Sequence, residues 1–342
     1  MSKERYLIVK GCAGLGNRMY TLSRAIQYAD LNNRKIYIDW SDGQFDKKGV
    51  NPFYDYFEID SSITQFKIHD IEEGGSVYPK LYGSNLKASI YDFYIHVNRM
   101  IQVTLMDKML HKAATLTNLN YGEKLFGYWY PSLKGKSLSE KQKLKGVFDS
   151  ESFSLGSNMK KDKEEDVVIF ADFSPEPNRD ILLNKIRLKS ALQKKVSIKA
   201  KHLGLIENCV GVHVRYTDKK PTKTLEALLK RCEVEVGNGK QIFLATDNKE
   251  IEKQFKDQFG EKLALNLKLM PKEAEEKGLH RWAYNDNSKA DVLRKMFEES
   301  IEDMWLLAEC SELFYQGNSS FSVFSSIISK KSSEDWMKFI AE

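Results

Sequence analysis

The run Gly-Val-His-Val-Arg-Tyr-Thr-Asp-Lys, which ends at Lys219, carries residue types that bind a diphosphate. Alternation along an extended strand places His213 and Arg215 on one face, opposite the valines. Arg215 then emerges at the carboxyl end, where parallel sheets bind ligands, and its guanidinium can hold two phosphate oxygens while Thr217 and Lys219 add donors. A leaving nucleoside diphosphate needs such groups because negative charge accumulates on its β-phosphate. The alternative is an ordinary strand end with a structural Arg215–Asp218 pair.

A second polar loop follows the apolar run at 241–245. Thr246, Asp247 and Asn248 lie between this predicted strand and a predicted helix over 249–258, and they can accept hydrogen bonds from a base or a ribose. Asp247 has an alternative role as the N-cap of that helix, because Asp and Asn are favoured there.

A third loop joins the predicted strand 312–315 to a helical pattern that begins near Phe321. Its residues are Gly317, Asn318, Ser319 and Ser320. Small side chains, backbone N–H groups and a helix N-terminus together favour a phosphate, whereas the alternative is a plain serine cap. Because all three loops follow strands of one predicted sheet, we expect them to open at the same edge and to form one nucleotide-diphosphate site.

A glycine-rich loop near the N-terminus suggests a competing chemistry. Its glycines are Gly11, Gly14 and Gly16. This spacing is the reverse of the dinucleotide-binding fingerprint, and Asp39 closes the next strand where a ribose-binding acid could sit. An NAD-dependent oxidoreductase is therefore the main alternative. The reversed spacing and the Asn17-Arg18 pair, from which Arg18 would face a cleft, count against it, and we favour a loop that approaches the donor or acceptor across a gap between domains.

The elements that must position these loops form two α/β series within 342 residues, a length that favours two domains. The first series is a βαβ unit, with strands at 6–10 and 35–39 and a helix between them that Asn32-Asn33 stops. The polar stretch 154–166 resembles a linker, and a strand at 167–171 and a basic amphipathic helix over 179–203 follow it. A long helix is also expected over 101–116. We predict Rossmann-like domains at 1–165, on the acceptor side, and at 166–342, on the donor side.

Composition and motif spacing make several classes of function less favoured. The net charge of +5 is spread along the chain, which does not favour nucleic acid as a partner, and the four cysteines are far apart. No pair of histidines has metal-ligand spacing, and the Asp-x-Asp element of metal-dependent glycosyltransferases is absent as a strand-end motif. No run is long and apolar enough for a signal sequence or a membrane span, so we expect a cytoplasmic protein that only a membrane-bound acceptor would bring to a surface.

The chain resembles the fucosyltransferases of the GT-B fold, which include α1,6-fucosyltransferases of N-glycans and nodulation factors, α1,2-fucosyltransferases and protein O-fucosyltransferases. The resemblance is carried by Gly14-Leu-Gly-Asn-Arg-Met19, by Gly211 to Lys219, by Phe243 to Asn248 and by Asp303 to Ser326. These motifs span most of the chain, and the His-Val-Arg-x-Thr-Asp-Lys run is the most specific and closest to the α1,6 group. The resemblance implies two Rossmann-like domains that face a cleft.

It also implies a role for each matching residue. Arg215 would bind the β-phosphate with Asp218 and Lys219 nearby, Asp247 and Asn248 would lie near the guanosine, Asp303 would lie on a base-recognition helix, and Ser319, Ser320 and Ser322 would lie at the phosphates. The predicted donor site adds Gly14, Asn17, Arg18, Thr217 and Asn318, and the predicted catalytic residues are Arg215 and His213. The α1,6 enzymes have a glutamate after the motif where this chain has Lys223, so the general base is unassigned and Glu226 is the nearest acid.

The function expected from these observations is inverting transfer of fucose from GDP-fucose to a hydroxyl of a glycan or oligosaccharide, α1,6-like or α1,2, without a metal or other cofactor. Assembly of a surface polysaccharide or secreted oligosaccharide would suit such an enzyme. The alternatives are another GDP-sugar donor, the NAD-dependent oxidoreductase, and a catalytically silent protein that binds GDP or glycan.

Overall fold

The computed structural model describes residues 4–71, 74–79, 82–90, 92, 162–172, 176–216, 222–271, 286–329 and 331–339. The helix predicted over 101–116 lies outside them, as does most of the stretch 154–166. The chain divides into two compact units, the first comprising residues 1–12, 21–42 and 61–176 and the second comprising residues 13–20, 43–60 and 177–342. Within the described ranges, no helix is long and apolar enough to cross a bilayer.

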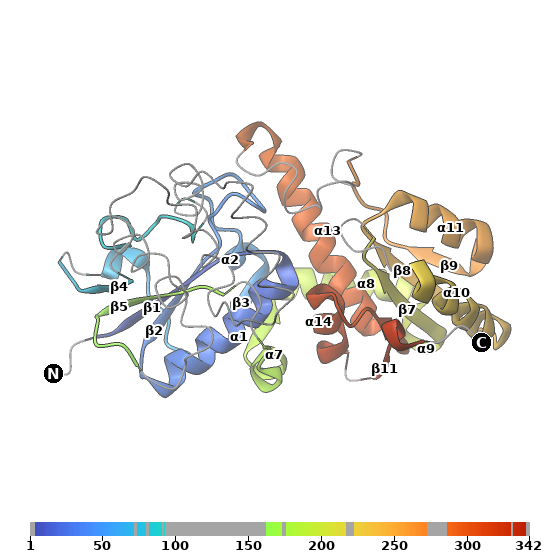
Figure 1. Cartoon of the computed structure of the whole chain (residues 1–342), viewed down its shortest axis with the longest axis horizontal. Coiled ribbons are helices and arrows are strands. Elements are labelled where there is room, and N and C mark those ends of the chain that lie inside the picture. Colours follow the sequence, from blue (N-terminus) through green and yellow to red (C-terminus); the bar gives the residue numbers. More distant parts are fainter. Residues whose placement is uncertain are drawn as a thin grey trace, which may run out of the picture. The chain divides into compact units, whose positions relative to one another are not determined.

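The first unit contains a parallel four-stranded sheet in the order β2-β1-β5-β4 (Figure 1). Its strands are β1 (Tyr6–Lys10), β2 (Lys35–Asp39), β4 (Val77–Tyr78) and β5 (Val167–Phe170). Helix α1 (Leu15–Leu31) connects β1 to β2, as the sequence predicts, and Asn33 follows it with a positive φ of 51°. Every residue of β1 and β5 is buried, which is typical of central strands in a parallel sheet.

The position of β5 determines where the first unit ends. β5 pairs with β1 and β4, so this strand belongs to the first sheet and the first unit continues to Glu176 instead of ending at residue 165. Two short segments of the N-terminal half, residues 13–20 and 43–60, belong to the second unit. The sequence could not indicate that these two segments belong to the second unit, because their assignment results from long-range packing.

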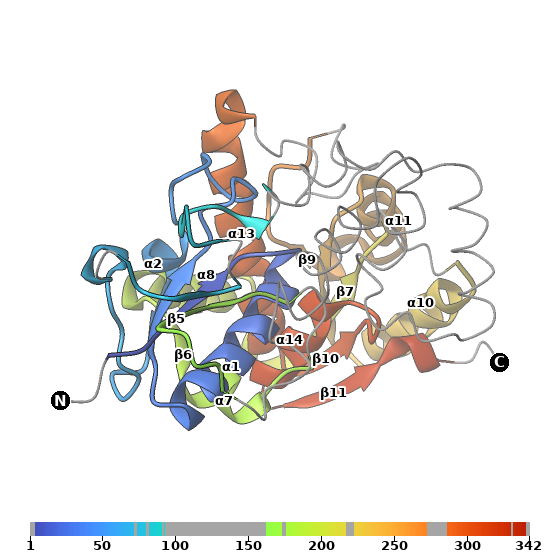
Figure 2. The ribbon, with the colours of Figure 1, turned by 60° about the vertical axis from the view of Figure 1, so that its left-hand side comes forward.

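The second unit is built on a parallel five-stranded sheet in the order β11-β10-β7-β8-β9 (Figure 2). Its strands are β7 (Cys209–Val214), β8 (Gln241–Thr246), β9 (Leu263–Leu265), β10 (Glu312–Tyr315) and β11 (Ser332–Asp335). β10, β7 and β8 are neighbours, with Phe314 opposite Val212 and Val214 opposite Thr246. Their carboxyl ends therefore meet at one edge, which confirms the predicted arrangement of the three loops. β9 and β11 are not predicted from the sequence.

Six described helices of the second unit pack on its sheet or on one another. They are α8 (Ser190–His202), α9 (Leu205–Asn208), α10 (Thr222–Gly237), α11 (Lys249–Phe259), α13 (Ala290–Glu309) and α14 (Ser320–Ile328). The valines of β7 pack in a core with Leu228 of α10, Phe255 of α11 and Trp336. A Cβ on Gly211 would lie 3.0 Å from Sγ of Cys310, which directly follows α13. Alternation thus directs the valines to one face of β7, and Gly211 and His213 to the face that α13 covers.

One predicted helix is wrong. The sequence analysis expects a single helix over 179–203, but the structure has α7 (Arg179–Asn184), β6 (Ile186–Leu188) and α8. β6 is buried at both ends and exposed at its centre, and it pairs antiparallel with β3 (Phe57–Ile59), which follows α2 (Phe53–Tyr56). A buried-exposed-buried pattern of three residues is too short to interrupt a helical reading of the sequence. Short 3-10 helices complete the fold at η1 (Ile68–Asp70), η4 (Gly260–Lys262), η5 (Asn287–Lys289) and η6 (Trp336–Lys338).

Candidate functional site

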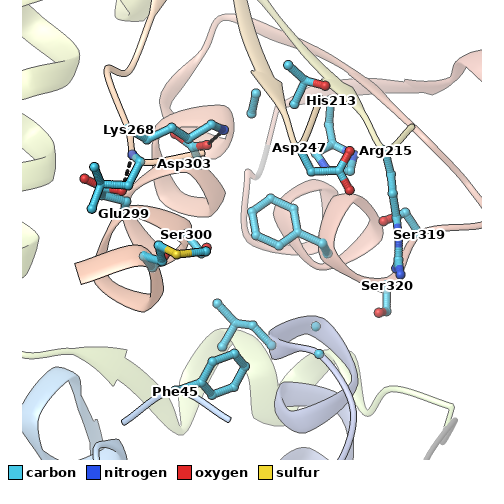
Figure 3. Close-up of a pocket in the computed structure, with 18 residues that line it drawn as sticks. Phe45, His213, Arg215, Asp247, Lys268, Glu299, Ser300, Asp303, Ser319 and Ser320 are labelled. Atoms are coloured by element: carbon cyan, nitrogen blue, oxygen red, sulfur yellow. Dashed lines mark hydrogen bonds and ion pairs between the residues drawn. The ribbon is translucent and has the colours of Figure 1, made fainter. Parts of the chain in front are cut away.

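A pocket opens at the carboxyl edge of the second sheet, and all of its lining residues belong to the second unit (Figure 3). The ends of β7 and β8 contribute side chains, as do the segment after β9, the face of α13 and the N-terminus of α14. The glycine loop before α1 and Phe45 complete the lining. Figure 3 shows Lys268, Asp303 and Glu299 on one side of the pocket and Arg215, Ser319 and Ser320 on the other.

Two side chains fix the backbone that carries Arg215. The Arg215 N–H donates to Oε1 of Gln316 at 2.7 Å, and the Tyr216 N–H donates to Oδ1 of Asp247 at 2.8 Å. Both Arg215 and Asp247 line the pocket. Asp247 therefore joins the end of β8 to the end of β7, and Gln316 joins the end of β10 to the end of β7. The backbone at Arg215 is thus fixed at the centre of the sheet edge.

His213 lies at the same edge, where it is buried and forms part of the pocket lining. The ring stacks on Phe321, with centroids 4.9 Å apart, and no described residue gives its Nδ1 a hydrogen-bond partner. Burial, followed by the positive charges of Lys268 and Arg215, lowers the pKa of His213 to about 3. The imidazole is therefore neutral near pH 7 and a weak proton acceptor, but it can still exchange a hydrogen bond with a ligand in the pocket.

The N-terminus of α14 places a serine hydroxyl beside Arg215. Ser319 has the N-cap position, yet its hydroxyl makes no capping hydrogen bond, is buried and has no partner among the described residues. A plain serine cap therefore does not describe Ser319. Ser319 is part of the pocket lining, and a buried hydroxyl without a partner costs free energy. Ser320 also lines the pocket, at the first position of the helix.

Two other predicted residues of this loop support the backbone instead. Ser322 accepts a hydrogen bond from the Gln316 N–H at 2.7 Å and is fully buried, and Oδ1 of Asn318 accepts from Nε2 of Gln316 at 2.9 Å. Neither residue is part of the lining. Their contacts hold Gln316, which in turn holds the backbone of Arg215.

Helix α13 presents one face to the pocket. Its lining residues are Met296, Glu299, Ser300 and Asp303, at the helical spacing i, i+3, i+4 and i+7. Asp303 is 3% exposed; its Oδ1 accepts from Nδ2 of Asn266 at 2.8 Å, and its Oδ2 forms an ion pair with Lys268. Burial raises the pKa of Glu299, which accepts a hydrogen bond from the Leu269 N–H at 2.8 Å. These contacts fasten the segment after β9 to the helix.

The glycine loop reaches the pocket through Gly14, Leu15 and Gly16. A Cβ on Gly16 would lie 2.4 Å from the backbone carbon of Ser320, so this glycine permits direct backbone contact between the start of α1 and the start of α14. The structure therefore uses Gly16 for packing against a helix N-terminus. Asn17, which the sequence analysis includes in the donor site, is not part of the lining.

Arg18 is buried, although the sequence analysis expects it to face a cleft. It is 1% exposed, with its Nε donating to the Ala13 carbonyl at 3.0 Å and one terminal nitrogen donating to Oε1 of Gln44 at 2.5 Å. Its guanidinium lies 4.5 Å from the ring centroid of Phe45, which does line the pocket and which also stacks on Phe297. Arg18 thus positions a wall of the pocket from behind.

The cap of α11 differs from the sequence-based alternative. Asn248, and not Asp247, is the N-cap, and its Oδ1 accepts from the N–H groups of Glu250 and Ile251 at 2.9 and 3.1 Å. Asp247 is left to hold Tyr216 and to line the pocket. The predicted donor-site residues Thr217, Asp218 and Lys219 lie outside the described residues.

Sequence reasoning missed part of the pocket. Lys268 and Leu269 follow β9, a three-residue strand whose Leu-Ala-Leu sequence carries little signal, while Met296, Glu299 and Ser300 could have been found by extending the helical period back from Asp303. No sequence signal would have indicated Phe45. In the described part of the chain, no group of three or more His, Cys, Asp or Glu side chains could hold a metal ion.

Comparison with known proteins relates this geometry to a fold. No family model matches the sequence, and no curated protein matches it either. Among solved structures, fucosyltransferase NodZ from Bradyrhizobium superposes with a TM-score of 0.57 at 16% identity, covering 95% of this chain and 93% of that chain. NodZ α-1,6-fucosyltransferase soaked with GDP-fucose gives a TM-score of 0.58 with the same identity and coverage.

POFUT1 in complex with GDP also matches, with a TM-score of 0.52 at 10% identity, covering 97% of this chain and 98% of that chain. Identities this low establish the arrangement of the backbone and leave the chemistry of the site to be argued from its residues. The predicted fold is confirmed: this chain has the GT-B fold of the NodZ and POFUT1 fucosyltransferases.

Proposed function

We propose that the chain is a glycosyltransferase that transfers fucose from GDP-fucose to a hydroxyl of a glycan. The observation that carries the proposal is the convergence of Arg215, Ser319, Ser320 and Asp303 on one pocket at the carboxyl edge of a parallel sheet. These residues were selected from motifs that are far apart in the sequence, and the family resemblance implies phosphate or base contacts for each of them. The fold supports the same function, since NodZ has been co-crystallised with GDP and soaked with GDP-fucose, and POFUT1 has been crystallised in complex with GDP.

The two sides of the pocket suit the two halves of a nucleoside diphosphate (Figure 3). On one side a guanidinium, the hydroxyls of Ser319 and Ser320, and the N-terminus of a nine-residue helix favour phosphate oxygens. The buried carboxylate of Asp303, on the other side, can accept hydrogen bonds from the N–H groups of a base. The hydroxyl of Ser319 and Nδ1 of His213, both without a described partner, would gain hydrogen bonds when the donor binds.

In this account Arg215 acts on the leaving group. The acceptor oxygen attacks the anomeric carbon of fucose as the bond from that carbon to the β-phosphate oxygen breaks, and the guanidinium neutralises the charge that develops on GDP. We propose displacement with inversion and without a metal, α1,6-like or α1,2. The proton acceptor is unassigned: His213 is a weak base in its buried setting, so its proposed role is a hydrogen bond to the donor.

A donor-consumption assay tests the proposal. Purified protein is incubated in EDTA with GDP-fucose, GDP-mannose or UDP-glucose and a mixture of oligosaccharide acceptors, and release of the nucleotide and formation of product are followed by chromatography. We expect GDP release from GDP-fucose that increases with acceptor, and the product linkage then decides between α1,6 and α1,2. Turnover of GDP-mannose instead would show that the transferred sugar is mannose and not fucose. GDP binding without any turnover would favour a catalytically silent protein.

A further inference from the structure

The pocket contains a charged pair that sequence reasoning did not include, formed by Lys268 and Asp303. Lys268 follows β9 and is 12% exposed, and Asp303 on α13 is 4% exposed at its side chain. Figure 3 shows both residues on the side of the pocket away from Arg215 and Ser319. An ion pair so enclosed is no strong source of stability, because desolvation opposes the attraction of the two charges.

The contacts of this pair leave hydrogen-bonding capacity that points to a ligand. An ammonium group has three N–H donors, and Asp303 is the partner described for Lys268. A carboxylate has about four acceptor positions, and Asp303 uses two of them, one for Asn266 and one for Lys268. The pair therefore offers donors beside acceptors at one wall of the pocket.

A network behind the pair fixes this arrangement. Oδ1 of Asn266 accepts from Nζ of Lys199 at 2.7 Å, and Lys199 also forms an ion pair with Glu302. Because Asn266 donates to Asp303 from the same amide, its orientation is determined and the Asp303 carboxylate is held in place. The N–H of Leu269, the next residue after Lys268, is tied to α13 through Glu299. Lys268 is thereby held on a short segment that is fastened on both sides.

The edge of guanine has the complementary pattern. Its O6 and N7 are acceptors, whereas its N1–H and its 2-amino group are donors, and a lysine on O6 or N7 is among the commonest specific contacts to guanine. Adenine presents a 6-amino donor in place of O6 and an N1 acceptor in place of N1–H. An ammonium beside a carboxylate thus attracts both O6 and N1–H of guanine. Against adenine the same pair would set a donor against the 6-amino donor and an acceptor against the N1 acceptor.

We propose that Lys268 is a specificity-determining residue that recognises O6 of the donor's guanine, in register with Asp303 on the N–H edge. This inference rests on the proposed function, since it assumes that the pocket holds a guanine nucleotide. In this proposal Lys268 and Asp303 select the purine base, whereas Arg215 and the serines bind the diphosphate.

The test is calorimetric titration of the wild type and of Lys268→Met with GDP, IDP and ADP. IDP keeps O6 and N1–H but lacks the 2-amino group, so it isolates the contacts at positions 1 and 6. We expect Lys268→Met to weaken GDP and IDP binding by the same factor of about 10 to 100, the value of a hydrogen bond from a charged group, and to change ADP binding by less than about 3-fold.

Two further variants serve as a conservative replacement of Lys268 and as a control. Lys268→Arg retains a cation beside Asp303 and should keep most of the preference for GDP over ADP, so the proposal stays testable even if Lys268→Met unfolds. Lys253→Met is the matched control, because Lys253 is 78% exposed on α11 and pairs with Asp257 there. That control should bind all three nucleotides like the wild type.

The outcomes separate the inference from the function on which it rests. Equal losses of GDP and ADP affinity in Lys268→Met would place Lys268 at the phosphates, and unchanged selectivity would give it no part in reading the base; either result would overturn the inference while leaving GDP as the ligand. A wild type that does not prefer GDP over ADP would instead contradict the proposed function itself.

Discussion

Replacement of Arg215 by alanine should reduce GDP affinity about 10-fold to 100-fold while leaving GMP affinity nearly unchanged. The side chain lies at the carboxyl end of β7, and a charge-assisted hydrogen bond to a phosphate is worth about 1.5–3 kcal/mol. Transfer should decrease more than binding, by about 100-fold to 1,000-fold, because the charge that Arg215 neutralises is greatest in the transition state. Titration with GDP and GMP, together with initial rates on GDP-fucose, measures both effects.

Arg187→Ala is the control for that experiment. Arg187 is 61% exposed on β6 and pairs with Asp60, so its removal should change neither binding nor transfer. An equal loss of GDP and GMP affinity in Arg215→Ala would remove Arg215 from the β-phosphate. Full transfer activity in that variant would show that the chemistry occurs elsewhere.

Two glycines only two positions apart should respond very differently to alanine. A Cβ on Gly16 would lie 2.4–2.6 Å from backbone atoms of Ser320 and Phe321, so Gly16→Ala must displace the start of α1 from the start of α14. We expect a loss of unfolding free energy of about 1–3 kcal/mol, together with weaker GDP binding because the α14 N-terminus moves. Chemical denaturation measures the stability, and calorimetry measures the affinity.

Gly14→Ala provides the matched comparison for stability. Nothing lies within 4 Å of a Cβ at Gly14, and its φ is not positive, so the change in unfolding free energy should stay within about 0.5 kcal/mol. Similar stabilities for the two variants would mean that the N-termini of α1 and α14 can move apart at little cost in free energy. A stable Gly16→Ala protein would remove the structural reason for this glycine.

The elements that the sequence could predict are those with strong local signals. β1, β2 and β10 have their predicted bounds, and β8 differs by one residue, because apolar runs that end in polar turns define buried parallel strands well. The common edge of the three loops followed from strand adjacency. The single helix predicted over 179–203 failed because β6 is formed only by its pairing with β3, which lies more than 120 positions earlier in the chain.

Local sequence signals also separate the site residues that could be predicted from those that could not. Arg215, Ser319 and Asp303 could be selected because each lies in a motif at the end of a strand or on a periodic helix. Lys268 could not, since β9 is too short to be distinguished from a loop, and the neutral state of His213 depends on burial that no motif encodes. Arg18 shows the opposite case: a cation in a loop motif was predicted to bind the donor, whereas its described guanidinium contacts are with Ala13 and Gln44 inside the protein.

The most direct test of the central claim is calorimetric titration of the purified protein with GDP, UDP and NAD in the presence of EDTA. We predict that GDP binds with a Kd of about micromolar order, corresponding to about −8 kcal/mol, and that UDP and NAD bind at least about 10-fold more weakly. Binding of NAD that GDP does not displace, or no binding of any of the three, would contradict assignment of the pocket to a guanosine diphosphate sugar and would return attention to the glycine loop at Gly11 to Gly16.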